Sequence, residues 1–185
     1  PERADLPDPL VADGAPIATA ESWAARRPYV RHMIQFYEYG TVPPAPGGVR
    51  IENETPQTVL DGAAALHTFT LRRGPGEGIA VDCGYYLTVT GEGPFPVIVA
   101  VDPVFDAHVL PTAQQVIDRG YAFAGFRYLD VAADVAERDG GIYPLYPEYD
   151  WGTVAAWAWG ASRLIDHLIT VEAIDGSRVA VTGHS

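Results

Sequence analysis

The sequence predicts an α/β fold in which a mostly parallel β-sheet lies between two layers of helices, with an antiparallel hairpin ahead of the parallel strands. Two patterns in the 185 residues carry this prediction. In the second half of the chain, short continuous apolar runs, typical of strands covered on both faces, alternate with helical stretches. Ahead of them, two stretches rich in β-branched and aromatic residues flank a Gly-Pro-Gly turn. Strands that alternate with helices form right-handed βαβ units.

The N-terminal segment is expected to differ from the rest of the chain. Residues 1–21 are proline-rich and show no sustained periodicity, which predicts an extended N-terminal arm. A helix is predicted over residues 22–39, because apolar residues recur there at helical spacing. Thr19 or Ser22 is the candidate cap of this helix, and Gly40 is expected to end it.

The remaining elements follow from the same two patterns. The hairpin comes first, and the βαβ units follow it. The expected strands cover residues 58–73, 79–90, 95–101, 121–126 and 178–183, and the expected helices cover residues 111–119 and 151–169.

Composition limits the classes of partner. The chain has 12 Lys+Arg residues, all of them arginine, against 24 Asp+Glu, which gives a formal net charge of −12. Nucleic acids and anionic membranes need a clustered basic face, so neither is expected as a partner. No apolar run is long enough for a transmembrane helix, and Cys83 alone forms neither an internal disulfide nor a cysteine-based metal site. No metal and no cofactor is expected.

The third buried strand leads into a turn that suits a catalytic serine, Gly183-His184-Ser185. In an α/β-hydrolase the nucleophile lies on a sharp strand-to-helix turn within Gly-x-Ser-x-Gly. We therefore predict Ser185 as the nucleophile of such a fold, and a serine that caps the next helix is the alternative. The triad acid and histidine follow the serine in this fold and are expected downstream. Residues 22–185 are thus expected to be the N-terminal part of one catalytic domain that needs a further C-terminal segment.

Two loops are candidates for the substrate side of the site. Residues 102–108 leave the carboxyl end of the first buried strand, where ligands bind in open α/β sheets and where hydrolases stabilise the oxyanion. Asp102, Asp106 and His108 also allow a metal interpretation, but a solvated loop is the simpler one. In the second loop, residues 130–150, the tyrosines predict either an aromatic rim for sugar rings or buried support.

The other histidines are given no catalytic role. His184 directly precedes Ser185 on a tight turn, so its side chain is interpreted as structural. His167 lies on a helical face near Arg163 and Asp166, and we interpret it as solvated or packed.

Motifs spread along nearly the whole chain resemble those of a single protein family. They are Trp23-Ala24-Ala25-Arg26-Arg27-Pro28, Tyr37-Glu38-Tyr39-Gly40, Gly140-Gly141-Ile142-Tyr143-Pro144, Asp150-Trp151-Gly152, Ala156-Trp157-Ala158-Trp159-Gly160 and Val181-Thr182-Gly183-His184-Ser185. Together these motifs resemble the glucuronoyl esterases of carbohydrate esterase family 15 in their bacterial form. The Ala-Trp-Ala-Trp-Gly helix that leads toward the serine turn is the most specific of them.

The resemblance implies a secreted or periplasmic α/β-hydrolase that acts in lignocellulose degradation. Such an enzyme cleaves the ester between 4-O-methyl-glucuronic acid of glucuronoxylan and lignin alcohols, through an acyl-enzyme on Ser185. Phe105, His108 and Tyr143 are the candidate substrate-side loop residues. The stretch 101–105 departs from the family pattern, which is richer in glycine or asparagine, and this bears on the alcohol side of the ester. The alternatives are another serine carbohydrate esterase such as an acetyl xylan esterase, a catalytically inactive carbohydrate-binding relative, and a structural domain with a capping serine.

Overall fold

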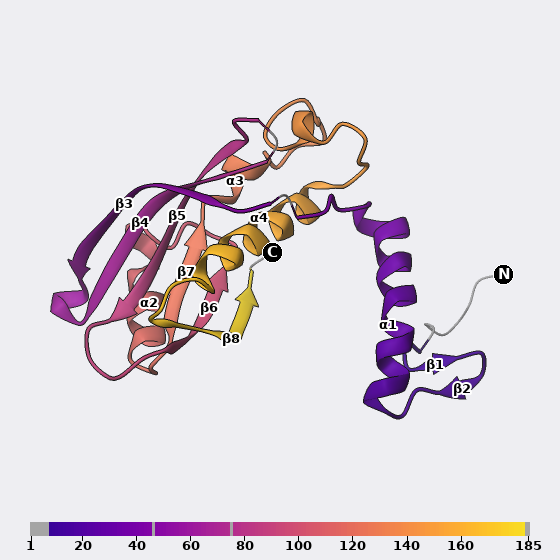
Figure 1. Cartoon of the computed structure of the whole chain (residues 1–185), viewed down its shortest axis with the longest axis horizontal. Coiled ribbons are helices and arrows are strands. Elements are labelled where there is room, and N and C mark those ends of the chain that lie inside the picture. The colour runs from indigo at the N-terminus through magenta and orange to yellow at the C-terminus, as the bar shows by residue number, and fades with distance from the viewer. Residues whose placement is uncertain (1–7, 46, 75, 184–185) are drawn as a thin grey trace.

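A six-stranded sheet in the order β3-β4-β5-β7-β6-β8 forms the centre of the computed structural model, which describes residues 8–45, 47–74 and 76–183 (Figure 1). The strands are β3 (Arg50–Val59), β4 (Ala64–Arg73), β5 (Ile79–Thr88), β6 (Phe95–Ala100), β7 (Ala122–Phe126) and β8 (Ile174–Thr182). β3, β4, β5 and β7 pair antiparallel in turn. β6 runs parallel to both β7 and β8, so the predicted parallel part of the sheet consists of these three strands.

Helices cover both faces of the sheet. α2 (Leu110–Ile117) connects β6 to β7, and α4 (Thr153–Leu168) precedes β8. Alternate residues of each strand face opposite cores. Ala122, Ala124 and Phe126 of β7 belong to the core under α4, whereas Phe123 belongs to the core under α2. The result is the predicted three-layer arrangement, in which Figure 1 shows α4 in front of the sheet and α2 behind it.

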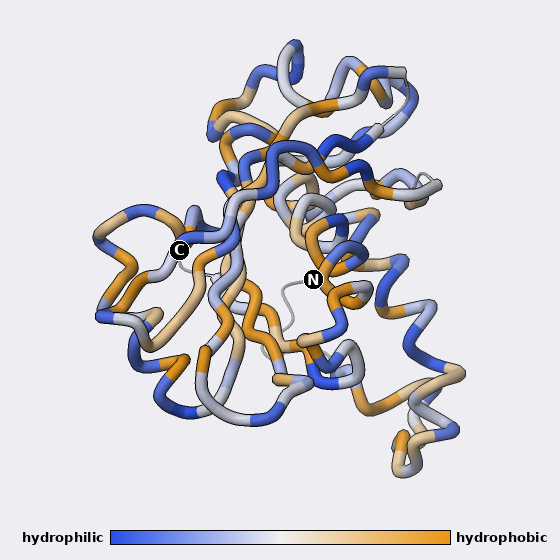
Figure 2. The backbone as a smooth tube through the Cα atoms, turned by 60° about the vertical axis from the view of Figure 1, so that its left-hand side comes forward, coloured by the Kyte–Doolittle hydropathy of each residue, from blue (hydrophilic) through white to orange (hydrophobic). Residues whose placement is uncertain are grey.

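α4 packs very closely against the sheet, and a glycine permits this. A Cβ added at Gly160 would lie 2.8 Å from the Cγ2 atom of Val131 and 2.9 Å from the Cε2 atom of Phe126. The same face of α4 buries Trp159, Leu164 and other small or apolar residues. Figure 2 shows hydrophobic segments along the central part of the backbone, while the outer loops carry hydrophilic and hydrophobic segments in alternation.

One expected strand was wrong in extent. The stretch 58–73 is divided by a 3₁₀ turn, η2 (Leu60–Gly62), in which Leu60 and Asp61 adopt positive φ angles of 53° and 51°. Its first residues belong to β3, an additional strand that pairs antiparallel with β4. The Asp-Gly pair is a turn signal, but the threonine, valine and leucine residues around it imitate one continuous strand. The hairpin of β4 and β5 forms as predicted, and β6 and β7 match their expected ranges to within one residue, whereas β8 begins at Ile174 instead of residue 178.

The N-terminal part of the chain projects from the sheet as a separate helix (Figure 1). Its described residues form a short ribbon of β1 (Val11–Ala12) and β2 (Ala15–Pro16), then α1 (Ala20–Ile34), which continues into the π-helical turn η1 (Gln35–Tyr39). Thr19 caps α1 in a reciprocal capping box with Ser22. None of the residues of α1 is buried. The junction is anchored where the backbone N–H of Gly152 donates to the carbonyl of Tyr39 over 2.8 Å.

Within the described ranges, we find no helix that combines the length and the apolar character needed to cross a membrane.

The packing of α4 on the sheet should dominate the stability of the fold. Leu164 lies on the buried face of α4 and is fully buried. We therefore expect Leu164→Ala to lower the free energy of unfolding by about 3 kcal/mol, because apolar burial is lost and a cavity remains. Urea denaturation monitored by tryptophan fluorescence measures this change. Ser162→Ala, an exposed position on the same helix, is the matched control and should change it by less than about 0.5 kcal/mol. A similar, small loss in both variants would contradict the prediction.

Candidate active site

The carboxyl ends of β6 and β8 lie side by side at one edge of the sheet. Ala100 pairs with Thr182 in the parallel register, and the backbone N–H of Val101 donates to the carbonyl of Thr182 over 3.0 Å. A Cβ added at Gly183 would lie 3.9 Å from the Cβ of Val101. The loop that follows β6 therefore begins directly beside Gly183, the last residue that the structure describes. His184 and the predicted nucleophile Ser185, which come next in the sequence, lie outside the described residues.

The loop after β6 is fixed by a close approach to β7. A Cβ added at Gly125 would lie 2.3 Å from the carbonyl oxygen of Asp102 and 2.5 Å from the Cγ1 atom of Val104. Such distances exclude any larger residue without movement of the backbone, so the loop folds back over this glycine. Val104 is itself fully buried in the core under α2.

A buried tyrosine holds the same loop from β5. The hydroxyl of Tyr86 donates to the carbonyl oxygen of Val104 over 2.9 Å, and Tyr86 is fully buried. Burial raises the pKa of the Tyr86 hydroxyl, so it stays a protonated donor at all ordinary pH values. Strands β5 and β7 together fix the backbone of the loop that begins beside Gly183.

Phe105 lies at the tip of this loop and is half-buried. Its ring packs over Gly84 of β5, and the guanidinium of Arg127 lies 5.4 Å from the ring centroid. Arg127 also pairs with Asp106 at 3.9 Å. Phe105 lines a hollow of about 250 Å³, together with residues of β3, β4 and β5 that include Asp82 and Cys83. This hollow places an apolar ring at the edge of the sheet where substrates of open α/β folds bind.

Cys83, which also lines this hollow, is not suited to be a nucleophile. The residue is almost completely buried. Burial raises the pKa of its thiol far above the usual range, with the nearby carboxylates of Asp82 and Asp130 acting in the same direction. A thiol in such surroundings remains protonated and inert.

His108 shares the loop with Phe105 but faces solvent. It lies in the 3₁₀ turn η3 (Ala107–Val109) just before α2, and it is exposed. Asp106, which the metal interpretation of this loop includes, pairs with Arg127. Across the part of the chain that the structure describes, no group of three or more His, Cys, Asp or Glu side chains is arranged to hold a metal ion.

Tyr143 lies in a different environment from Phe105 and His108. It belongs to the 3₁₀ turn η4 (Tyr143–Leu145), is only 5% exposed, and donates from its hydroxyl to the Oγ1 atom of Thr153 over 3.2 Å. Its ring meets Trp151 edge to face at 6.0 Å, and Tyr146 packs against Trp151 and Trp159 at similar distances. The sequence predicted either an aromatic rim for sugar rings or buried support. Tyr143 and Tyr146 are buried and support the start of α4.

Sequence reasoning did not identify three of the residues that shape this edge. Gly125 carried a signal, since a glycine within an apolar strand often marks a close backbone approach. Tyr86 carried none, because its partner is a backbone carbonyl 18 residues away. Asp130 carried no signal beyond its place at the start of the second loop, but its carboxylate accepts from the backbone N–H of Asp82 over 3.0 Å. It thereby ties α3 (Tyr128–Val131) to β5.

The sheet order and the two helix layers define an α/β-hydrolase-like fold. A sequence profile described as "Glucuronyl esterase, fungi" matches residues 76–185. The chain therefore belongs to the glucuronyl esterase family, as its motifs predicted.

Individual relatives agree with this assignment. A 4-O-methyl-glucuronoyl methylesterase from Schizophyllum commune is 32% identical over 97% of this chain and 43% of its own length. A glucuronoyl esterase from Solibacter usitatus superposes with a TM-score of 0.85 at 26% identity, over 100% of this chain and 58% of that one. A promiscuous CE15 esterase from a marine bacterial metagenome gives a TM-score of 0.76 at 27% identity, over 100% and 58% of the two chains. This chain thus spans only about half of the length of its relatives.

The hydroxyl of Tyr86 provides a test of how the loop after β6 is held. Tyr86→Phe keeps the ring but leaves the buried carbonyl of Val104 without its donor, so we expect a loss of about 1–2 kcal/mol in the free energy of unfolding. We also expect faster amide hydrogen exchange in residues 102–106, measured by mass spectrometry. Tyr121→Phe, at a tyrosine that is 39% exposed, is the control and should change neither quantity. Unchanged exchange in Tyr86→Phe would show that the loop does not depend on this hydrogen bond.

Proposed function

We propose that the complete protein is a serine carboxylic ester hydrolase that cleaves the ester between 4-O-methyl-glucuronic acid of glucuronoxylan and lignin alcohols. Ser185 is its nucleophile in this proposal. The observation that supports it is the hydrogen bond from the backbone N–H of Val101 to the carbonyl of Thr182, which brings the loop after β6 beside the strand end that precedes Gly183-His184-Ser185 in the sequence. Membership of the glucuronyl esterase family supports the same substrate class.

The mechanism is acyl transfer. The Oγ atom of Ser185 attacks the carbonyl carbon of the uronate ester and forms a tetrahedral intermediate, which collapses to an acyl-enzyme with release of the alcohol. Water then attacks the acyl-enzyme and releases the free uronic acid. The general base that takes the serine proton, and the acid that orients that base, belong downstream of residue 185 in the order typical of this fold.

The loop after β6 contributes to the oxyanion site in this proposal. Preorganised backbone N–H groups stabilise an oxyanion well only if they do not move during the reaction. The packing of Val104 over Gly125 and the hydrogen bond from Tyr86 supply that rigidity. This loop is not rich in glycine but contains Pro103, Val104 and Phe105. It therefore offers fixed walls to the alcohol side of the ester.

The three candidate substrate-side residues take different roles. Phe105 offers the face of a half-buried ring, and His108 an exposed imidazole on the same loop. Both are proposed to touch the substrate. Tyr143 is buried against Trp151 and Thr153, so we propose that it positions the start of α4 instead of contacting the sugar. Secretion or a periplasmic location fits a substrate that is part of the plant cell wall.

Activity and labelling of the complete protein test the proposal. We expect the complete protein to hydrolyse methyl 4-O-methyl-glucuronate, with the rate measured by titration of the released acid. Ser185→Ala should lower kcat at least about a thousandfold. A fluorophosphonate probe should label the unaltered protein at Ser185 and should not label the variant. Ser177→Ala, at an exposed serine of β8 whose hydroxyl donates to Asp175, is the matched control and should keep both activity and labelling.

The substrate panel separates the alternatives. Acetylated xylan turned over faster than the methyl uronate ester would favour an acetyl xylan esterase. Binding of glucuronoxylan without hydrolysis or labelling would favour a catalytically inactive carbohydrate-binding relative. Neither binding nor labelling would leave a serine that only caps the next helix.

A further inference from the structure

Two buried arginines, Arg163 of α4 and Arg73 at the end of β4, share the carboxylate of Asp166. The Nε atom of Arg163 lies 2.8 Å from the Oδ2 atom of Asp166, and the Nη2 atom of Arg73 lies 3.6 Å from the same oxygen. The arginine side chains are 8% and 4% exposed, whereas that of Asp166 is 38% exposed. Burial, followed by the like charge of Arg163, lowers the pKa of Arg73, but a guanidinium stays protonated at any working pH. A positive charge is thus held at low exposure in a strongly acidic protein.

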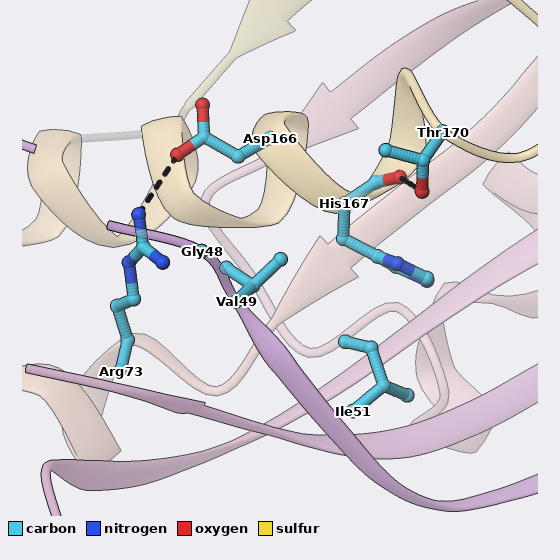
Figure 3. A pocket seen from close by; sticks show the side chains of 7 residues that line it. All are labelled: Gly48, Val49, Ile51, Arg73, Asp166, His167 and Thr170. Carbon is cyan, nitrogen blue, oxygen red and sulfur yellow. Dashed lines mark hydrogen bonds and ion pairs between the residues drawn. The ribbon is translucent and has the colours of Figure 1, made fainter. Parts of the chain in front are cut away.

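The Arg73 side chain forms one wall of an open hollow of about 490 Å³ (Figure 3). Val49, just before β3, and Ile51, in β3, supply apolar lining, and the last turn of α4 with Thr170 closes the other side. Figure 3 shows Arg73 and Asp166 at one end of this space and His167 with Ile51 at the other. The volume lies within the range of small-molecule sites.

His167 offers a polar atom at the far end. The residue is 9% exposed, and its Nε2 atom is buried without a hydrogen-bond partner among the described residues. Its ring packs edge to face on Phe69 at 4.9 Å. Burial lowers the pKa of the imidazole, which keeps the ring neutral near pH 7, so that it can donate or accept one hydrogen bond at a ligand. A buried polar atom without a partner is costly, which favours an occupant that satisfies it.

These features fit one class of ligand. We propose that the hollow binds a small amphipathic carboxylate, with its carboxylate on Arg73, its apolar body over Val49 and Ile51, and its distal end toward His167. A guanidinium presents a planar fork of donors that matches a carboxylate. A simple inorganic anion could meet the positive charge of Arg73 but would leave the apolar lining uncovered and the Nε2 atom of His167 without a partner.

The proposal is tested by calorimetric titration of the complete protein at constant ionic strength with three probes. Benzoate has both the charge and the apolar ring, benzamide has the ring without the charge, and acetate has the charge without the ring. We expect benzoate to bind about tenfold more tightly than either of the others. This comparison needs no variant, so it does not depend on how substitutions affect folding.

Three variants locate the binding. Arg73→Gln should weaken benzoate binding about tenfold. Val49→Trp keeps both arginines but fills the hollow, and it should weaken binding to a similar degree. Arg72→Gln is the matched control, because Arg72 is the next residue of β4 and pairs with Glu52 at 2.8 Å, and it should leave binding unchanged. Thermal unfolding checks that each variant is folded.

Some outcomes would overturn the proposal. These are an absence of benzoate binding at concentrations in the tens of millimolar, equal binding of benzoate and benzamide, or benzoate binding that survives in both folded Arg73→Gln and folded Val49→Trp. Acetate that binds as well as benzoate would reduce the hollow to a site for simple anions and would likewise overturn it.

Discussion

The close approach of the β6 loop to Gly125 is the constraint on which the edge of the sheet depends. The carbonyl of Asp102 and the side chain of Val104 occupy the space where any other residue at position 125 would place its Cβ. Because the loop lies down on β7, the carbonyl of Val104 comes within reach of the Tyr86 hydroxyl, and Phe105 comes to lie over Gly84. The register of β6 and β8 then sets this fixed loop beside Gly183. Gly84 and Gly125, which pair with each other on the neighbouring strands β5 and β7, thus decide where the candidate site can form.

The parallel strands and their helices could be predicted because their signal is local. Strands β6 and β7 are continuous apolar runs, and α4 shows an apolar face at helical spacing, so neither depends on distant residues. The division at η2 was missed for the opposite reason. Leu60 and Asp61 take positive φ angles there, and a β-rich composition on both sides conceals a turn of three residues.

The site was harder to predict, since its parts meet only in three dimensions. The loop after β6 could be expected from the rule that ligands bind at the carboxyl ends of parallel strands. The sequence could not show whether a tyrosine lies on an exposed rim or in the core. Tyr143 and Tyr146 are buried by their contacts with Trp151 and Trp159, which follow them in the chain. The contribution of Tyr86 depends on a backbone carbonyl, and such a partner leaves no trace in residue type.

The absence of lysine from the sequence becomes meaningful in this light. A lysine placed where Arg73 or Arg163 lies would lose much of its hydration and would readily give up its proton. Arginine keeps its charge at the same burial, and its flat group also stacks, as Arg163 does over Trp159 at 5.2 Å and Arg127 over Phe105 at 5.4 Å. An acidic chain with a formal net charge of −12 can therefore hold persistent positive charge in its interior. Because these charges are carried by arginines, the aromatic residues around them serve as their packing partners as well as forming the core.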